Sequence, residues 1–192
     1  MVQKPKITKI MVANRGEIAI RVLRAANELG LATVAVFAEE DKLALHRFKA
    51  DETYQVGMGL GAIKAYLSID EMIRVARAAK VDAIHPGYGF LSENPEFADA
   101  CAEAGIIFIG PTPEIMRRLG NKVSAREVAV QAGTPVMPAP GPLPEDTYEV
   151  RRQAAAVGYP LMLKASWGGG GRGMRVIEDE SQLDGEVASG RR

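Results

Sequence analysis

The sequence predicts an α/β domain built on a parallel sheet, followed by the beginning of a second domain. Short apolar runs, typical of buried strands, alternate with amphipathic helical segments through the first 120 residues. This alternation is typical of a parallel sheet with helices on both faces. Beyond Gly120 the pattern changes to a helix, a proline-rich connector and a strand pair. We therefore expect one domain at residues 1–120 and a second at 121–192.

The strands of the first domain are expected where apolar residues run without interruption. They cover residues 9–13, 32–37, 81–85 and 106–110. Helices are expected between them because apolar residues recur there at helical spacing. Their starting signals are Ser68 with Glu71, a capping-box pair, Asn94 with Pro95, and Thr112 with Pro113. A β-α-β unit of this kind has parallel strands and a right-handed crossover.

The second domain is expected to contain three helices and two strands. The helices fall at 121–133, at 146–158 with Asp146 and Glu149 at cap spacing, and from 181 onward. The strands fall at 159–166 and 173–179, on either side of a glycine run. This strand pair could hardly bury its apolar face alone, so we expect the chain to be a fragment or to need the rest of its fold.

Composition excludes several classes of protein. The formal net charge is zero, which argues against nucleic acid and acidic membrane as partners. No apolar run approaches the roughly 18 residues that span a bilayer. Cys101 is the single cysteine and His46 and His85 are the only histidines, so neither a disulfide nor a Cys/His zinc site is expected. We expect a cytoplasmic protein with Cys101 in the core.

The segment "KASWGGGGRGM" (164–174) carries the strongest local signal. It formally matches G-x-G-x-x-G, but a strand rather than a helix is expected after it, which argues against a dinucleotide site. No Gly-Lys-Ser/Thr closes the loop, which excludes a P-loop. The loop therefore predicts a flexible hairpin whose backbone N–H groups cover a polyphosphate, with Lys164 reaching a phosphate oxygen. The alternative is a disordered surface hairpin.

Two further segments are candidates for a site. The turn "ANRGE" lacks the glycines of a cofactor fingerprint, so the acids at 39–41 are expected to form a solvated loop. The loop "HPGYGFLSENPEF" (85–97) follows a strand at the carboxyl edge of the sheet, where ligands usually bind. Tyr88 and Glu93 could face a ligand there. Equally, Tyr88 and Phe90 could anchor the loop while Glu93 caps the next helix. His85 is expected to be a structural histidine.

Lys122 lies in the first turn of a predicted helix. A cation is mildly unfavourable near a helix N-terminus, because the helix dipole is positive there. The position therefore hints at an anionic partner.

Four segments together resemble the biotin carboxylase component of biotin-dependent carboxylases. They are "ANRGEIAIRVLRAANELG", "HPGYGFLSENPEFA", "GPTPEIMRRLGNKVSAR" and "YPLMLKASWGGGGRGMRVI", in the same order and spacing. "GNKVSAR" and the tryptophan of "KASWGGGG" look more like the pyruvate carboxylases than the other members. The resemblance implies a Rossmann-like (pre-ATP-grasp) domain followed by the start of an ATP-grasp domain.

The resemblance also implies an activity and a set of site residues. Such enzymes use ATP to convert bicarbonate to carboxyphosphate and then carboxylate biotin held on a carrier-domain lysine. Carried over, the ATP-binding residues are Lys122, Lys164, Gly168, Gly169, Gly170, Gly171, Gly173 and Met174. Tyr88 and Glu93 would lie near the biotin and bicarbonate. Arg21, Arg24 and Glu28 match positions at a homo-oligomer (dimer) interface.

The resemblance puts the magnesium ligands and the catalytic base beyond residue 192. The chain alone is therefore expected to be inactive and to hold no catalytic or metal-binding residue. Two alternatives stay open: another ATP-grasp carboxylate or carbamoyl ligase, and a non-catalytic nucleotide-binding or assembly module. A dinucleotide enzyme is the least favoured.

Overall fold

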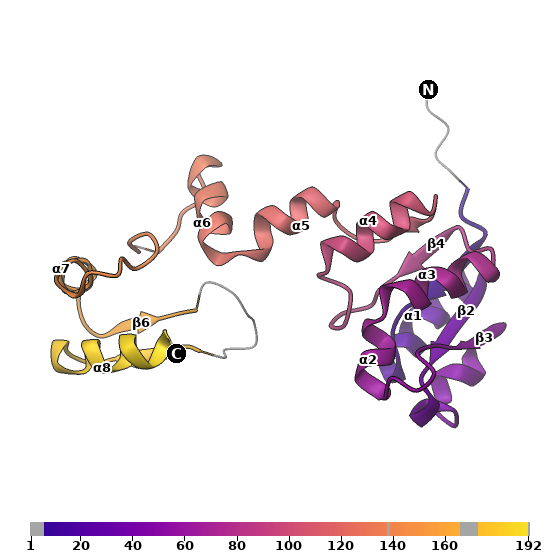
Figure 1. Cartoon of the computed structure of the whole chain (residues 1–192). Coiled ribbons are helices and arrows are strands. Elements are labelled where there is room, and N and C mark those ends of the chain that lie inside the picture. Colours follow the sequence, from indigo (N-terminus) through magenta and orange to yellow (C-terminus); the bar gives the residue numbers. More distant parts are fainter. Residues whose placement is uncertain (1–5, 138, 166–172, 192) are drawn as a thin grey trace. The chain divides into compact units, whose positions relative to one another are not determined.

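The computed structural model describes residues 6–137, 139–165 and 173–191 (Figure 1). They divide into two units, Met1–Met116 and Arg117–Arg192. The division falls inside α5 (Pro113–Gly120), a few residues before the expected boundary at Gly120. Each unit is described by itself below.

The first unit is built on a five-stranded sheet in the order β3-β2-β1-β4-β5. The strands are β1 (Lys9–Val12), β2 (Ala32–Phe37), β3 (Glu52–Gln55), β4 (Ala83–His85) and β5 (Ile107–Phe108). Every pairing is parallel, as expected from the alternating sequence pattern. Met11 of the central strand lies opposite Val34 on one side and Ile84 on the other.

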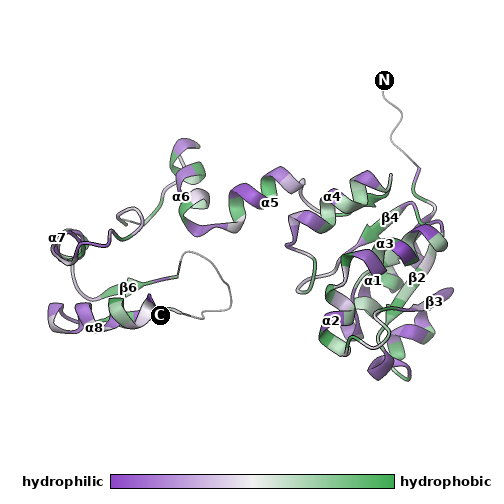
Figure 2. Cartoon of the chain, viewed as in Figure 1, coloured by the Kyte–Doolittle hydropathy of each residue, from purple (hydrophilic) through white to green (hydrophobic). Residues whose placement is uncertain are grey.

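Helices cover both faces of this sheet, which confirms the predicted layering. The helices are α1 (Gly16–Glu28), α2 (Ala62–Leu67), α3 (Ile69–Ala78) and α4 (Pro95–Glu103), with 3-10 turns at Glu39–Asp41 and Leu45–Lys49. Successive strand residues point to opposite faces. Accordingly, Val12 packs with Leu23 of α1, whereas Met11 shares a larger cluster with residues of α3 and α4. Figure 2 shows the strands as mainly hydrophobic and the helices as banded.

The predicted helix starts are confirmed where the capping side chains are described. The Ser68 hydroxyl accepts from the Glu71 N–H, and the Asn94 amide oxygen accepts from the Phe97 N–H at 3.0 Å. The capping box at Ser68 is only half formed, however. The Glu71 carboxylate instead accepts from the Gly57 N–H at 3.1 Å and from Arg74. Glu71 therefore ties α3 to the loop after β3.

The second unit holds a helix, a strand pair and two further helices. They are α6 (Lys122–Gln131), α7 (Thr147–Val157), β6 (Leu161–Leu163), β7 (Arg175–Ile177) and α8 (Glu180–Gly190). β6 and β7 are antiparallel, with Met162 opposite Val176, as the expected hairpin requires. The core of this unit is small: Val150, Ala154, Ile177, Leu183 and Val187. No helix among the described residues is long and apolar enough to cross a bilayer.

The expectation of a solvated acidic loop at residues 39–41 is wrong for Asp41. Glu39 and Glu40 are exposed, but Asp41 is only 5% exposed. Its carboxylate pairs with Arg15 and accepts a hydrogen bond from the Tyr66 hydroxyl at 2.7 Å. A buried carboxylate persists only where such partners replace water. The acidic run therefore contains one structural residue that joins the end of β2 to α1 and α2.

The Tyr66 hydroxyl gives a first test of this buried contact. It donates to Asp41 and accepts from the Ala38 N–H at 3.2 Å. Tyr66→Phe should lower the free energy of unfolding by about 1–3 kcal/mol, because a buried donor loses its partner. Urea denaturation followed by far-UV circular dichroism measures it. Tyr54→Phe is the matched control, since that hydroxyl meets Glu52 in a half-exposed strand. Equal effects of the two substitutions would contradict the assignment.

Cys101 gives a second test, of the core itself. Its side chain is fully buried, as predicted, and burial raises the pKa of the thiol to about 12. The thiolate is the reactive form, so at pH 7–8 the folded protein should react with a thiol reagent such as DTNB at least about 100-fold more slowly than the urea-unfolded protein. Rapid stoichiometric labelling of the native chain would contradict this core.

Candidate functional site

The order in which strands are added to the sheet reverses between β1 and β4, and the carboxyl ends of these two neighbouring strands mark that point. From β1 the chain steps to β2 and β3 on one side, then returns to β4 on the other. Ligands of parallel α/β sheets usually bind at such a point. Here the β1–α1 turn meets the loop after His85. The two segments are joined by the Ala13 N–H, which donates to the His85 carbonyl at 2.9 Å.

Tyr88 and Glu93 lie on this loop with their side chains exposed. Tyr88 is 60% exposed, and its hydroxyl donates to the Glu17 carboxylate at 2.7 Å. That hydrogen bond raises the pKa of the Tyr88 phenol, so the phenol stays protonated at neutral pH. Glu93 is exposed and does not cap α4, because Asn94 does. Glu93 therefore does not cap the helix, whereas the Tyr88 hydroxyl does tie the loop to α1 through Glu17.

Phe90 is the residue that anchors the loop. Its ring stacks on Tyr66 at 5.1 Å between centroids and packs against the main core cluster. His85 is a structural histidine, as expected. Its Nδ1 accepts from the Gly87 N–H at 3.0 Å, and burial lowers the pKa of the ring. The imidazole is therefore neutral at pH 7, and its Nδ1 shapes the turn by accepting this hydrogen bond.

The exposed face of α1 carries the three residues matched to an interface. Arg21, Arg24 and Glu28 are all exposed, and the Arg24 guanidinium donates to Glu28 at 2.9 Å one turn away. A shallow cavity of about 550 Å³ adjoins them. It is lined by Ile20, Arg24, Asn27, Glu28 and Lys49. The face therefore offers charges of both signs around a small apolar hollow.

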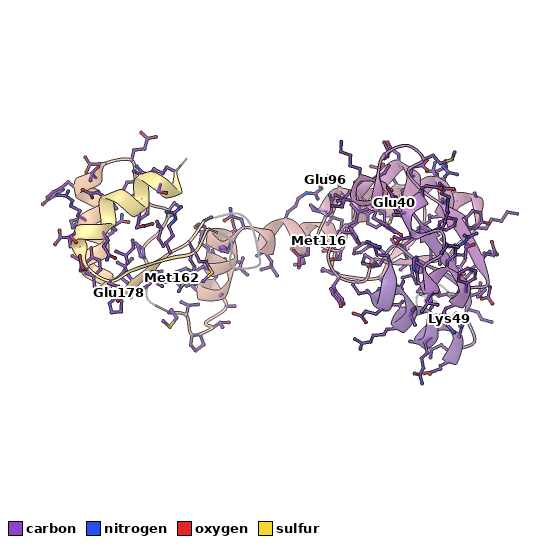
Figure 3. The ribbon with its side chains drawn as sticks, turned by 90° about the horizontal axis from the view of Figure 1, so that it is seen from below. Glu40, Lys49, Glu96, Met116, Met162 and Glu178 are labelled. Carbon is purple, nitrogen blue, oxygen red and sulfur yellow. The ribbon has the colours of Figure 1, made fainter. Side chains whose placement is uncertain are left out.

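Lys122 and Lys164 line one cavity in the second unit. Its volume is about 1240 Å³, and its walls come from α6, the connector before α7, α7 itself, the β6–β7 pair and α8. Most of the other wall residues are apolar, among them Val130, Leu161 and Met162, the last of which is labelled in Figure 3. An apolar cavity with a few polar groups is the usual form of a small-molecule site. Two lysines that lie far apart in the sequence thus line the same cavity.

The local structure explains how each lysine is held. Lys122 is the first residue of α6, whose N-cap Asn121 accepts from the Val123 N–H at 2.8 Å. Lys164 follows the last residue of β6. The same helix is tied to the connector, because Arg126 donates to the Ala139 carbonyl at 3.3 Å. These contacts hold the two elements from which Lys122 and Lys164 line the cavity.

The glycine loop itself is only partly described. Gly168, Gly169, Gly170 and Gly171 lie outside the described residues. Gly173 has a φ of +73°, which favours glycine, and a Cβ there would lie 3.3 Å from Ala165. Met174 is 43% exposed and is not among the described residues that line the cavity. Its predicted place near an adenine therefore stays a prediction.

The described residues do not supply a metal site. No group of three or more His, Cys, Asp or Glu side chains within residues 6–137, 139–165 and 173–191 could hold an ion. The described cavity offers cationic rather than anionic groups at its wall, apart from Glu127. It is suited to an anion.

Sequence analysis missed two residues of the first unit that touch the candidate loop. Asn14 is fully buried, and its amide donates to the carbonyls of Pro86 at 2.8 Å and Tyr88 at 3.0 Å. Glu17 accepts from the Tyr88 hydroxyl. The signal that could have revealed Asn14 is its position directly after a buried strand, in the turn that opens a helix.

Comparison with known proteins gives matches over both units. The family model "Biotin carboxylase, N-terminal domain" matches residues 6–116, and the model "Carbamoyl-phosphate synthase L chain, ATP binding domain" matches 121–192. The mitochondrial pyruvate carboxylase of Rattus norvegicus is 52% identical over 178 residues, 93% of this chain and 15% of its own. The pyruvate carboxylase of Staphylococcus aureus is 55% identical over 181 residues, 93% of this chain and 16% of its own.

Solved structures of biotin-dependent carboxylases also match this chain. Rhizobium etli pyruvate carboxylase matches with a TM-score of 0.88 and 66% identity, over 97% of this chain and 17% of its own. A biotin carboxylase–β-γ-ATP complex from Campylobacter jejuni matches with a TM-score of 0.90 and 42% identity, over 96% of this chain and 41% of its own. The chain thus spans about 15% of the length of the pyruvate carboxylases it matches. It belongs to the biotin carboxylase family, and it corresponds to the N-terminal part of the biotin carboxylase region of pyruvate carboxylases.

Proposed function

We propose that the protein containing this chain uses ATP to activate bicarbonate to carboxyphosphate and then carboxylates biotin held on a carrier domain. Pyruvate is the proposed final acceptor, which gives oxaloacetate. The observation that carries the proposal is the convergence of Lys122 and Lys164 on one cavity. The similar biotin carboxylase of Campylobacter jejuni was solved as a complex with β-γ-ATP, which supports the same assignment.

The proposed chemistry suits these residue types. In phosphoryl transfer a bicarbonate oxygen forms a bond to the γ-phosphorus while the bond to the bridging oxygen breaks and ADP leaves. The protein contributes mainly position and neutralisation of charge. Two ammonium groups at the wall of a largely apolar cavity supply both, because electrostatic attraction is stronger where water is displaced. Gly168–Gly171 and Gly173 are proposed to form the lid that covers the phosphates and excludes water.

The loop of the first unit is proposed to face the other substrates. Tyr88 and Glu93 would lie near the biotin and bicarbonate, as their exposure permits. Magnesium would supply positive charge that neutralises the ATP phosphates. As the resemblance to biotin carboxylases implies, we propose that its protein ligands lie beyond residue 192. The described residues fit the nucleotide's anionic groups, not the cation.

Two further properties are part of this proposal. The exposed face of α1, with Arg21, Arg24 and Glu28, is proposed to pair with its copy in a homo-oligomer. The compartment is proposed to be the cytoplasm, although the Rattus norvegicus relative is named as mitochondrial. Cell fractionation followed by immunoblotting tests the location.

A second candidate is supported by the match of residues 121–192 to the ATP binding domain of carbamoyl-phosphate synthase. In that case the ATP-activated bicarbonate would react with an amine or ammonia rather than with biotin. Measuring bicarbonate-dependent ATP hydrolysis with either biotin or ammonia as the acceptor separates the two. Stimulation by ammonia alone would favour the second candidate.

The two lysines give the direct test of the nucleotide site. In the intact protein, Lys122→Gln and Lys164→Gln should each lower kcat/KM for ATP by roughly 10- to 150-fold, since each removes one charged hydrogen bond to phosphate. The assay is bicarbonate- and biotin-dependent release of phosphate. Lys64→Gln, at an exposed lysine of α2 in the other unit, should leave it unchanged. Unchanged kcat/KM for ATP in both lysine variants, or an equal loss in the control variant, would contradict the assignment of the nucleotide site.

The charged face of α1 gives a test of the proposed assembly. Arg24→Glu places a like charge beside Glu28 and reverses one charge of a self-complementary surface. We expect the dissociation constant of the dimer to rise at least about tenfold, because like charges across an interface repel. Sedimentation velocity of the intact protein over a range of concentrations measures it. Arg77→Glu on α3 is the control, and an unchanged monomer–dimer equilibrium for Arg24→Glu would contradict the interface.

A further inference from the structure

The loop that carries Tyr88 is held from the β1–α1 turn at its backbone. Asn14 is fully buried and uses its whole amide: Nδ2 donates to the Pro86 and Tyr88 carbonyls, and Oδ1 accepts from the Arg15 N–H at 2.9 Å. An amide offers two donors and a carbonyl acceptor. One side chain therefore fixes two carbonyls of the loop relative to the end of β1.

The loop backbone at Gly87 packs so closely against the β1–α1 turn that a side chain would not fit between them. A Cβ on Gly87 would lie 2.6 Å from the Asn14 amide nitrogen and 2.7 Å from a methyl group of Ile18. Gly87 also has a φ of +69°, a conformation that other residues adopt only with strain. The backbone thus passes Asn14 at a distance that only glycine permits.

The same turn also holds the tip of the Tyr88 side chain. Its hydroxyl donates to Glu17 at 2.7 Å, and Glu17 lies in the first turn of α1. A carboxylate is favoured at that end of a helix by the helix dipole. Asn14 therefore fixes the backbone of Tyr88, and Glu17 fixes its phenol.

We propose that Asn14 and Glu17 are positioning residues that set the place and orientation of Tyr88 for the biotin and bicarbonate side of the reaction. The inference rests on the proposed function, in which Tyr88 faces those substrates. It assigns to the "ANRGE" turn a task that its pattern did not reveal, which is to fix a residue proposed to face the substrates. Neither positioning residue need touch a substrate.

Glu17 gives the sharper test, because it is exposed and its replacement should not impair folding. In the intact protein, Glu17→Ala should raise the KM for free biotin roughly 3- to 10-fold, the change expected for one hydrogen bond, with the KM for ATP unchanged. Glu17→Gln keeps an acceptor oxygen and should stay within about twofold of the unsubstituted protein. Glu96→Ala is the matched control, since Glu96 is an exposed acid in the first turn of α4.

A double-mutant cycle with Tyr88→Phe decides whether Glu17 acts through the phenol. If it does, Glu17→Ala should add less than about twofold to the KM for biotin once the hydroxyl is absent. Independent effects that multiply would overturn the proposal. So would a KM for ATP that rises in parallel with that for biotin, because that pattern indicates general destabilisation.

The test of Asn14 needs a control variant at another fully buried and hydrogen-bonded residue, because any such substitution reduces stability. Thr33 is also fully buried and hydrogen-bonded, but its hydroxyl donates to Asp51 at 2.7 Å at the amino end of β2, the opposite edge of the sheet. Asn14→Ala and Thr33→Val should both reduce stability, but only Asn14→Ala should raise the KM for biotin and speed amide hydrogen exchange in residues 86–92. If Asn14→Ala does not fold, Asn14→Asp takes its place, since the carboxylate can still accept from Arg15 but cannot donate to the loop.

Failure of the inference can be told from failure of the proposed function. Absence of bicarbonate- and biotin-dependent ATP hydrolysis in the unsubstituted protein refutes the function. Activity in the unsubstituted protein, together with an unchanged KM for biotin in Glu17→Ala and in the folded Asn14 variant, refutes the inference alone. Faster exchange in residues 86–92 of the Asn14 variant supports the backbone contact independently of activity.

Discussion

The first unit depends on the close approach of two backbones at the carboxyl ends of β1 and β4. Gly87 passes so near Asn14 that a methyl group would not fit, and the Asn14 amide meets two loop carbonyls there. The contact lies at the position where parallel sheets ordinarily open a crevice. Tyr88 and Glu93 lie on the exposed part of the loop that it holds. The geometry explains why this sheet lacks the glycine fingerprint of a dinucleotide site, since its turn is filled by a side chain of its own.

In the second unit, the limiting factor is the small amount of apolar surface that the core buries. Two short antiparallel strands and a five-residue core bury little apolar surface, and a hairpin alone is marginally stable. One side of the hairpin packs on α7 and α8 through Ile177, while Met162 and Val176 line the cavity. The cavity is thus bounded by both faces of the hairpin, since Leu161 and Leu163 of the core side also line it. Lys164 follows directly on that strand, so its position is set by strand pairing rather than by packing of the lysine itself.

Sequence reasoning succeeded where the determinant was local. The run at 32–37 matches β2 over its whole length. The Asn94 and Asp146 caps were also readable, because capping needs only residues a few positions apart. β3 was not predicted, since all four of its residues are half-buried and mostly polar at the sheet edge. Asp41 was misjudged because its partners Arg15 and Tyr66 are 26 and 25 residues away.

In the candidate site, too, only the residues with a local sequence signal could be predicted. Lys122 and Lys164 could be named from local pattern and from resemblance, because each stands beside a recognisable element. Asn14 was not singled out, since an asparagine after a strand is equally typical of an ordinary turn. Its role depends on a loop 72 residues later that must come within hydrogen-bonding distance. Glu17 combines both kinds of information: its charge suits the start of α1 for local reasons, and the fold then uses that same carboxylate to hold a phenol from another loop.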